Sequence, residues 1–460
     1  MEITEQDEAS NKSSLNVNTK NIIVRMIKLN PLTERLSQRN KNKNIGIYSA
    51  CTANDITLAA VMERAVETNT LALIEATANQ VNQYGGYTGM QPADFVAYIQ
   101  KIADSTDLSL NKLILGGDHL GPLTWQNEPE ESAMAKAEIL VRDFVLAGFT
   151  KIHLDTSMRL ADDDKKKILS DEIIAQRAAR LCRVAEDAFI EYSNKNKNAY
   201  APVYIVGSEV PIPGGAIEND ESVSVTLPEQ FKNTYCAFRD QFQKAGLEVA
   251  FERVIGVVVQ PGVEFSDLTV TEYDHTKASR LSGVLLEYPG LVFEGHSTDY
   301  QTREKLKEMV NDGVAILKVG PALTYALRQG LFALQDIECE LLAEQDVALS
   351  DFRAVLEKAM LSNPIYWQKY YHGQPSEIAL KRKYSFSDRC RYYLPNPDVS
   401  SAIQRLIHNI DHVDVPMSLL EQYMPLEYRK FRSGEIDKSA QSLLKEHIKG
   451  YINDYIYATT

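Results

Sequence analysis

The chain has 460 residues and a mass of 51.7 kDa, more than one average domain but enough for one large α/β barrel with a smaller appendix. Asp and Glu outnumber Lys and Arg by 63 to 49, and the net charge of −14 excludes a general binder of nucleic acid or anionic membrane. Mean hydropathy is −0.27, and no apolar run approaches the roughly 20 residues of a membrane-spanning helix. Five scattered cysteines without a C-x-x-C pair exclude a disulfide scaffold and a zinc finger.

The N-terminal region is polar. Residues 1–20 are rich in Asn, Ser, Lys and Glu, which predicts a disordered tail. The first residues lack the basic-then-apolar pattern of a secretory signal, and unpaired thiols are typical of a reducing compartment. We therefore expect a cytoplasmic protein. Helical apolar spacing over residues 22–36 precedes the first strand-like run.

One pattern then repeats up to about residue 340: a short apolar run, polar residues at its end, and an amphipathic helical stretch. Continuous apolar runs joined by helices predict parallel strands that are buried on both faces. Eight such repeats favour an α/β fold, a closed (β/α)8 TIM barrel over residues 21–340. The eight runs are residues 45–49, 71–76, 112–116, 151–155, 203–206, 254–259, 291–294 and 314–319.

The sequence pattern predicts two of the crossover helices especially clearly. Asn54-Asp55 can cap a helix over residues 56–67, and apolar periodicity predicts another helix over residues 171–186. The alternation of strands and helices stops near residue 341. The remaining residues, 341–460, show amphipathic helical stretches between Pro-containing loops, which predicts a helical C-terminal extension that packs on the barrel or on a partner.

Hydrogen-bonding or ionisable residues lie at the ends of all eight predicted strands. In this architecture the carboxyl ends of the strands form the mouth where active sites lie. One such residue is usually structural, but eight at one mouth are hard to explain by structure alone. The residues are Ser49, Glu75, Asp118, Asp155, Glu209, Gln260, Glu294 and Lys318.

The pair Asp118-His119 follows the third predicted strand closely. Adjacent strand residues point to opposite faces, so both side chains reach the mouth only if the strand breaks there. Glycines on both sides and Pro122 supply that break. We expect His119 to bind a divalent cation and Asp118 to transfer a proton. The alternative is a histidine that a neighbouring carboxylate satisfies in a tight turn.

A second pair, Glu294 and His296, lies two residues apart and faces one side of an extended segment. With His119 and Glu209 this pair would give two nitrogen and two oxygen ligands, a set that suits Zn²⁺, Mn²⁺ or Fe²⁺. For Glu209 the alternative is a capped turn residue before Pro211.

Two further carboxylates could each have one of two roles. Glu75 and Asp155 are either acid/base groups or ion-pair partners of Lys151 and Lys318. Lys318 also offers an alternative, an aldolase that forms a Schiff base with its substrate. We rank this alternative lower, because such an enzyme would not need the predicted set of metal ligands.

An anion site is predicted at the seventh and eighth strands. Ser297-Thr298 and Gly320 precede helices, so free backbone N–H groups and the helix dipole would face the mouth. No G-x-x-x-x-G-K-[ST] motif supports a P-loop kinase, and no G-x-S-x-G elbow occurs. The basic aromatic stretch 381–389 could reach a sugar phosphate or form a solvated face. The predicted substrate and phosphate set is Ser49, Gln260, Ser297, Thr298, Lys318 and Gly320.

From about residue 45 to residue 460 the sequence resembles the GatZ/KbaZ family, the second subunit of tagatose-bisphosphate aldolase. The family resembles in turn the class II, metal-dependent ketose-bisphosphate aldolases. The resemblance rests on long stretches at the strand ends, which are residues 46–51, 74–81, 85–90, 115–122, 151–155, 209–215, 258–265, 294–301 and 317–323, and on C-terminal residues 366–372 and 384–393.

In class II aldolases a strand-three Asp-His pair supplies a proton-transfer carboxylate and a metal ligand, which maps onto Asp118 and His119. The resemblance places Glu294 where that class has a metal histidine and Lys318 where it has a substrate-contacting asparagine. It finds no histidine near Gln260, where a third metal ligand is expected. Because the sequence differs from the class II pattern at these positions, we do not expect an intact metal site of three histidines.

The resemblance implies an accessory component that supports the activity and stability of a class II catalytic subunit of the GatY/KbaY type. The complex would split D-tagatose 1,6-bisphosphate during galactitol, N-acetylgalactosamine or tagatose 6-phosphate breakdown. The alternative is an autonomous metal-dependent D-tagatose 6-phosphate 4-epimerase. Either function implies a phosphorylated ketohexose as ligand, and neither involves nucleic acid or membrane.

Overall fold

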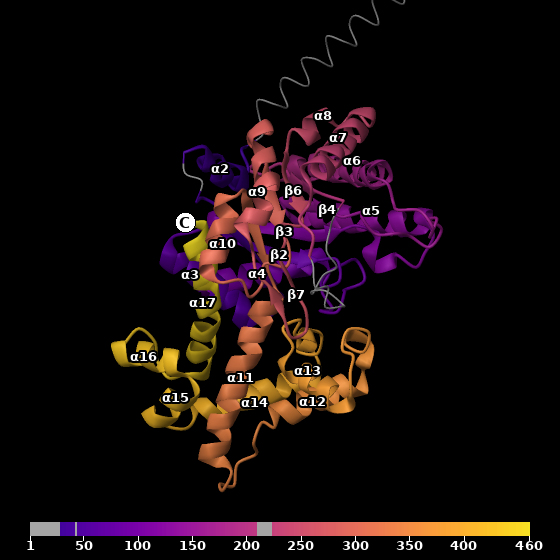
Figure 1. Ribbon diagram of the computed structural model, residues 1–460. Coiled ribbons are helices and arrows are strands. Elements are labelled where there is room, and N and C mark those ends of the chain that lie inside the picture. The colour runs from indigo at the N-terminus through magenta and orange to yellow at the C-terminus, as the bar shows by residue number, and fades with distance from the viewer. Residues whose placement is uncertain (1–27, 42–43, 209–222) are drawn as a thin grey trace, which may run out of the picture.

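A closed barrel of eight parallel strands forms the centre of the molecule, as the sequence predicts. The structure is a computed structural model that describes residues 28–41, 44–208 and 223–460. Around the barrel the strands follow the order β1-β10-β9-β6-β5-β4-β3-β2 (Figure 1). The strands are β1 (Ile47–Cys51), β2 (Ala72–Thr77), β3 (Leu113–Leu120), β4 (Lys151–Leu154), β5 (Val203–Val206), β6 (Val254–Val259), β9 (Val292–Gly295) and β10 (Val314–Val319).

The predicted strand bounds agree with the observed ones at β5, β6 and β10, and most of the others differ by one or two residues. The largest difference is at β3, which continues past Gly116 to Leu120 and so includes the Asp-His pair. A short antiparallel ribbon follows β6 and consists of β7 (Glu264–Phe265) and β8 (Val270–Thr271).

Helices surround the barrel and bury their apolar faces against it. Asn54 caps α3 as predicted, because its side chain accepts the backbone N–H of Thr57. The helix predicted over 171–186 is present and continues to Lys195. The helices between the strands are α3 (Asp55–Thr68), α4 (Pro92–Ser105), α5 (Glu130–Ala147), α6 (Asp171–Lys195), α7 (Pro228–Lys244), α8 (Glu248–Phe251), α9 (His275–Val284) and α10 (Arg303–Asn311).

Helix α2 (Pro31–Ser37) closes the N-terminal end of the barrel. Leu32 and Leu36 are buried and cluster with strand residues of the barrel interior. Asn30 fixes the start of α2, because its side-chain oxygen accepts the N–H of Leu32 and its amide donates to the carbonyls of Thr150 and Ala201. The helical spacing over 22–36 is thus realised in its last part, from Pro31 onward; residues 22–27 and the tail over 1–20 lie outside the described residues.

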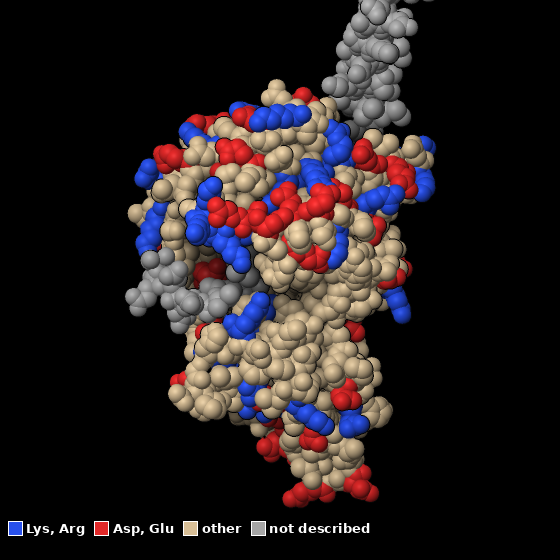
Figure 2. Space-filling view, turned by 90° about the vertical axis from the view of Figure 1, so that its right-hand side faces the viewer, with Lys and Arg blue, Asp and Glu red and all other residues tan. Residues whose placement is uncertain are grey.

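The C-terminal part is helical, as the sequence predicts, and lies beyond the mouth of the barrel (Figure 1). Figure 2 shows a waist where this narrower part meets the barrel. Its helices are α11 (Pro321–Leu342), α12 (Phe352–Ser362), α13 (Pro375–Tyr384), α14 (Pro397–Asp411), α15 (Met417–Tyr423), α16 (Pro425–Ser433) and α17 (Ala440–Thr459). Short 3-10 turns lie at η1 (Gln38–Asn40), η2 (Leu110–Lys112), η3 (Pro122–Trp125), η4 (Leu285–Glu287), η5 (Pro364–Tyr366) and η6 (Arg389–Tyr392).

The last helix, α17, returns to the barrel. It packs against α3, α10, α11 and strand β1, so it fills a place in the outer ring of helices (Figure 1). The hydroxyl of Tyr455 donates to the carbonyl of Thr298 just after β9, and Lys449 forms ion pairs with Glu63 and Glu67 of α3. The end of the chain therefore supports the elements that carry the mouth. Within the described ranges, no helix has the length and apolar character needed to cross a bilayer.

The packing of α17 can be tested through Ile452, which is completely buried on this helix. We expect Ile452→Ala to lower the free energy of unfolding by about 2–5 kcal/mol, because the truncation leaves a cavity between α17 and its neighbours. Urea unfolding followed by circular dichroism measures this change. The control is Gln441→Ala at an exposed position of the same helix, with an expected change within about 0.5 kcal/mol. Equal stabilities of the two variants would contradict the packing.

Candidate functional site

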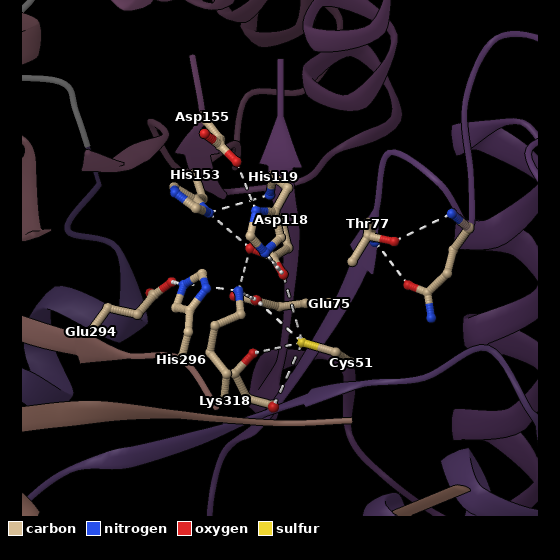
Figure 3. A network of polar contacts seen from close by, with 12 residues as sticks. Cys51, Glu75, Thr77, Asp118, His119, His153, Asp155, Glu294, His296 and Lys318 are labelled. Carbon is tan, nitrogen blue, oxygen red and sulfur yellow. Dashed lines mark hydrogen bonds and ion pairs between the residues drawn. The ribbon is translucent and has the colours of Figure 1, made fainter. Parts of the chain in front are cut away.

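Polar side chains from several strands meet at the carboxyl end of the barrel (Figure 3). Most are buried, yet some line a pocket that opens toward the C-terminal part of the chain. The sequence-predicted residues that line this pocket are Asp118, His119, His296, Ser297, Lys318 and Gly320.

The Asp118-His119 pair lies at a break in β3. His119 has a φ of 48°, in the left-handed region that a non-glycine residue rarely adopts. The pairing register between β3 and β4 shifts between Gly117 and Leu120. This is the break that the glycine-rich sequence predicts, and it brings both side chains of the pair into the mouth. Gly121 completes the turn, because a Cβ there would lie 1.7 Å from the carbonyl oxygen of Asp155.

Three imidazoles form a triangle at the mouth. The ring centroids of His119 and His153 are 5.1 Å apart, those of His119 and His296 are 5.0 Å apart, and those of His153 and His296 are 5.3 Å apart. One ligand atom from each ring and one carboxylate oxygen of Asp118 all lie within 4.8 Å of one another. The rings come from β3, from β4 and from the residue after β9.

Each imidazole has one ring nitrogen against a carboxylate. His119 Nδ1 lies 2.8 Å from Asp155 Oδ2, and His296 Nε2 lies 3.0 Å from Glu294 Oε1. For the third ring, His153 Nδ1 lies 2.8 Å from Asp118 Oδ1. Histidines that bind metal ions are commonly oriented in this way, with the second ring nitrogen left for the ion.

The donor set fits a divalent metal ion. Among the described residues, the buried Nε2 of His153 has no hydrogen-bond partner. Burial and the nearby Lys318 lower the pKa of His296 to about 3, so this ring is neutral, the form that binds metal. Although burial opposes it, the carboxylates of Asp118 and Asp155 raise the pKa of His119. Three imidazole nitrogens and a carboxylate oxygen suit Zn²⁺, Mn²⁺ or Fe²⁺, and the set alone does not select among these ions.

His153 was missed as a ligand by the sequence analysis, which found no third metal histidine. A signal was present, because His153 and Asp155 lie two residues apart and share one face of an extended segment. Glu209, a predicted ligand, lies outside the described residues. Glu294, another predicted ligand, supports His296 and contacts two lysines, and it is not among the four residues whose ligand atoms converge.

Two buried lysines hold the floor of the mouth. Lys151 is completely buried between Glu75 and Glu294, and its Nζ lies 2.7 Å from Glu294 Oε2. Lys318 contacts Asp118, and its Nζ lies 2.6 Å from Glu75 Oε2 and 3.4 Å from Glu294 Oε1. Glu75 is therefore an ion-pair partner of both lysines, whereas Asp155, the other open case, pairs with His119.

This network opposes a Schiff-base role for Lys318. Burial by itself would lower the pKa of its ammonium, but the carboxylates of Asp118, Glu75 and Glu294 hold that pKa well above its ordinary value. A Schiff base needs the neutral amine. The four carboxylates of Glu75, Asp118, Asp155 and Glu294 also face only two ammonium groups, so the cluster keeps an excess of negative charge that favours a cation.

The backbone N–H of Gly320, a predicted phosphate donor, already has a partner. Asp299 Oδ1 accepts the N–H groups of Gly320 at 3.0 Å and of Ala322 at 2.8 Å, so this carboxylate caps the start of α11. Thr298 donates its hydroxyl to the carbonyl of Lys318.

Two other members of the predicted substrate set also serve the fold. The side-chain oxygen of Gln260 accepts the N–H groups of Gly262 and Val263. Ser49 is completely buried in β1, and its hydroxyl lies 3.9 Å from the sulfur of Cys51. Of the six residues in that set, Ser297, Lys318 and Gly320 line the pocket.

Fold and site together define a (β/α)8-barrel protein whose mouth gathers a buried His/Asp cluster that could hold a metal ion. The chain belongs to the family described as D-tagatose-1,6-bisphosphate aldolase subunit GatZ/KbaZ-like, whose model matches residues 32–460.

The chain is also similar to solved structures. A probable tagatose 6-phosphate kinase from Sinorhizobium meliloti 1021 is 43% identical, with a TM-score of 0.81 over 90% of this chain and 100% of that chain. A fructose-bisphosphate aldolase from Campylobacter jejuni is 13% identical over 86% of this chain and 93% of its own, with a TM-score of 0.40. The YdjI aldolase from Escherichia coli K12 is 10% identical over 82% and 96%, with a TM-score of 0.37. At these values the two aldolases do not bear on function.

The buried cap of α11 gives a pH-dependent prediction. Burial raises the pKa of Asp299 to about 6, so the folded chain holds this proton more tightly than the unfolded chain does. The carboxyl thus favours folding at low pH, and this contribution is lost as the pH rises from about 4 through 6. Asp299→Asn keeps the oxygen that accepts the two N–H groups but cannot ionise. We expect the variant and the parent to be similarly stable near pH 4 and the variant to gain stability relative to the parent up to pH 8.

Urea unfolding at a series of pH values measures this difference, with exposed Asp346→Asn as the matched control. A stability difference between Asp299→Asn and the parent that stays constant from pH 4 to pH 8 would contradict the assignment.

Proposed function

We propose that this chain is a metal-dependent sugar-phosphate 4-epimerase that interconverts D-tagatose 6-phosphate and D-fructose 6-phosphate at its own barrel mouth. The observation that carries the proposal is the convergence of His119, His153, His296 and Asp118 at the barrel mouth, where all of them except the fully buried His153 line the pocket. A subunit that only supports a catalytic partner does not need such a cluster. The family description supplies the substrate class, a phosphorylated ketohexose.

The chemistry follows from the position of the inverted carbon. The two sugars differ at C4, and the C4 hydrogen is not acidic because it is not adjacent to the carbonyl. Breaking the C3–C4 bond solves this problem, since the C2 carbonyl stabilises the electron pair left on C3. The products in the pocket are the enediolate of dihydroxyacetone and glyceraldehyde 3-phosphate. Rotation of the aldehyde and re-formation of the C3–C4 bond on its other face invert C4 without any oxidant.

The residues of the mouth have separate roles in this scheme. Of the three predicted acid/base residues, only Asp118 lines the pocket, so we assign to it the removal of the C4 hydroxyl proton and its return after the aldehyde has turned. Lys318 also lines the pocket, and its ammonium would stabilise the negative charge that develops on the C2 oxygen. Asp155 and Glu294 orient His119 and His296.

The three imidazoles would hold the metal ion, which supplies Lewis-acid polarisation of the C2 carbonyl when it is bound. The pocket also keeps the two fragments together, because the C-terminal part of the chain contributes Arg391 and Tyr392 to its wall. Retention of both fragments distinguishes an epimerase from an aldolase that releases them.

The second candidate function is the accessory component of a tagatose-bisphosphate aldolase, which supports a class II catalytic subunit. The family description, which names an aldolase subunit, favours this candidate. The name of the Sinorhizobium meliloti relative suggests kinase action on tagatose 6-phosphate. The chain carries no G-x-x-x-x-G-K-[ST] motif, so this third activity finds no support in the sequence.

The test is conversion of D-tagatose 6-phosphate by the purified, metal-loaded chain in D₂O, followed by NMR. We expect D-fructose 6-phosphate that retains protium at C4, because the C4 hydrogen stays on the aldehyde throughout. A chelator should abolish the conversion and Mn²⁺ or Zn²⁺ should restore it. His153→Ala should lower the rate at least about 100-fold, since loss of a residue that merely orients a ligand already costs 10–100-fold.

The matched control is His408→Ala, an exposed histidine on α14, which should keep the parent rate. No conversion with any of the metals, together with a raised activity or Tm of a class II aldolase subunit on mixing, would reject the epimerase and establish the accessory role. Deuterium at C4 would reject the bond-cleavage route.

A further inference from the structure

The pocket at the barrel mouth has a second wall that comes from the C-terminal part of the chain. Arg391 and Tyr392 of η6 line it opposite the strand ends, and Tyr87 from the loop after β2 lines it as well. Arg391 also borders a neighbouring cavity between the barrel and helices α11 and α14. This residue therefore stands where the mouth meets the C-terminal helices.

The guanidinium of Arg391 lacks a carboxylate partner among the described residues. Its Nη1 donates to the carbonyls of Ser387 at 2.7 Å and Asp388 at 3.2 Å, and its Nη2 donates to the hydroxyl of Tyr392 at 3.2 Å. Of the five N–H groups of a guanidinium, these bonds leave two. Arg391 is half-buried, so its charge is only partly solvated.

The nearby carboxylates are engaged elsewhere. Asp388 accepts from Arg328 at 2.8 Å, and both of these residues are buried. Asp299, which also lines the pocket, accepts the two N–H groups at the start of α11. The positive charge of Arg391 acts on Asp299 and lowers its pKa, although burial dominates that pKa, and the two groups do not form an ion pair within 4 Å.

A second arginine, which is buried, adds to the positive charge next to Arg391. Arg389 is 2% exposed, and its Nε and Nη2 have no hydrogen-bond partner among the described residues. Its guanidinium lies over the ring of Tyr370, 3.2 Å from the centroid, while Arg391 lies over Tyr392 at 4.6 Å. Stacking on aromatic faces fixes a guanidinium and leaves its edge free for an anion.

Unpaired buried charges are costly, and an arginine edge matches the oxygens of a phosphate group. The pocket thus has metal ligands on one side and an unneutralised arginine on the other. We propose that Arg391, assisted by the hydroxyl of Tyr392, binds the phosphate group of the sugar substrate. The inference rests on the proposed function for the identity of the sugar, but the anion site is defined by Arg391 itself.

This assignment moves the phosphate away from the start of α11, where the sequence predicts it. There the N–H groups of Gly320 and Ala322 already bond to Asp299, so a phosphate would have to displace a carboxylate. At Arg391 no carboxylate of the described residues has to leave. A site on η6 would also make the C-terminal part of the chain a determinant of substrate specificity.

The test compares Arg391→Gln with Arg391→Lys and with a matched control, Arg429→Gln, at an exposed position of α16. Isothermal titration of the metal-loaded chain uses three probes: D-tagatose 6-phosphate, D-tagatose and inorganic phosphate. We expect Arg391→Gln to weaken binding of the sugar phosphate and of inorganic phosphate by about 10–100-fold, as expected for hydrogen bonds to charged groups, and to leave binding of D-tagatose unchanged.

Arg391→Lys keeps the charge but not the forked donor edge, so it should lose less affinity than Arg391→Gln, and Arg429→Gln should match the parent. The Tm of each variant shows that it is folded, and Arg391→Lys keeps a cation in place if Arg391→Gln is unstable. Sugar-phosphate affinity of Arg391→Gln or Arg391→Lys within twofold of the parent would overturn the proposal, as would an equal loss for D-tagatose.

The outcome separates this site from the proposed function. If the parent converts no sugar phosphate but its affinity for inorganic phosphate depends on Arg391, the result supports the anion site and rejects the epimerase. If Arg391→Gln converts D-tagatose 6-phosphate with an unchanged KM, the result supports the epimerase and rejects the anion site.

Discussion

The pairing of buried charges at the barrel mouth is the constraint on which the rest of the site depends. Lys151 and Lys318 hold Glu75 and Glu294, and without these ammonium groups the carboxylates would be buried unpaired at a cost of several kcal/mol each. Because the lysines neutralise only part of the negative charge, the site remains suited to a cation. The carboxylates next to the imidazoles then set which ring nitrogens are free. Charge balance and ligand orientation thus come from one network.

Much of the fold could be predicted because a barrel of parallel strands, buried on both faces, leaves continuous apolar runs in the sequence. The start of α3 could be predicted as well, since Asn54 lies where a capping residue is needed. The position of α17 could not. Its neighbours are α3 and α10, and no local pattern states which distant elements a helix will contact. The position of α2 could not be predicted either, because this helix closes the N-terminal end of a barrel that forms only when distant strands meet.

The residues of the candidate site also divide into those that a local sequence pattern predicts and those that depend on distant contacts. The Asp118-His119 pair could be predicted, since glycines beside a charged pair mark a strand break, and His119 has the positive φ that such a break requires. His153 was missed although its spacing from Asp155 is a local signal, because the sequence does not show that barrel closure brings this histidine to the rings of His119 on β3 and His296 after β9. Likewise, the sequence shows that Gly320 begins a helix, but not that Asp299, 21 residues earlier, accepts its N–H.

We propose above all that three imidazoles from distant parts of the chain share one metal ion. X-ray diffraction from crystals of the metal-loaded protein, recorded at the absorption edge of the metal, tests this claim most directly. We expect one strong anomalous peak at about 2.0–2.2 Å from a ring nitrogen of each of His119, His153 and His296. An ion bound elsewhere on the chain, with no anomalous density among these three rings, would contradict it.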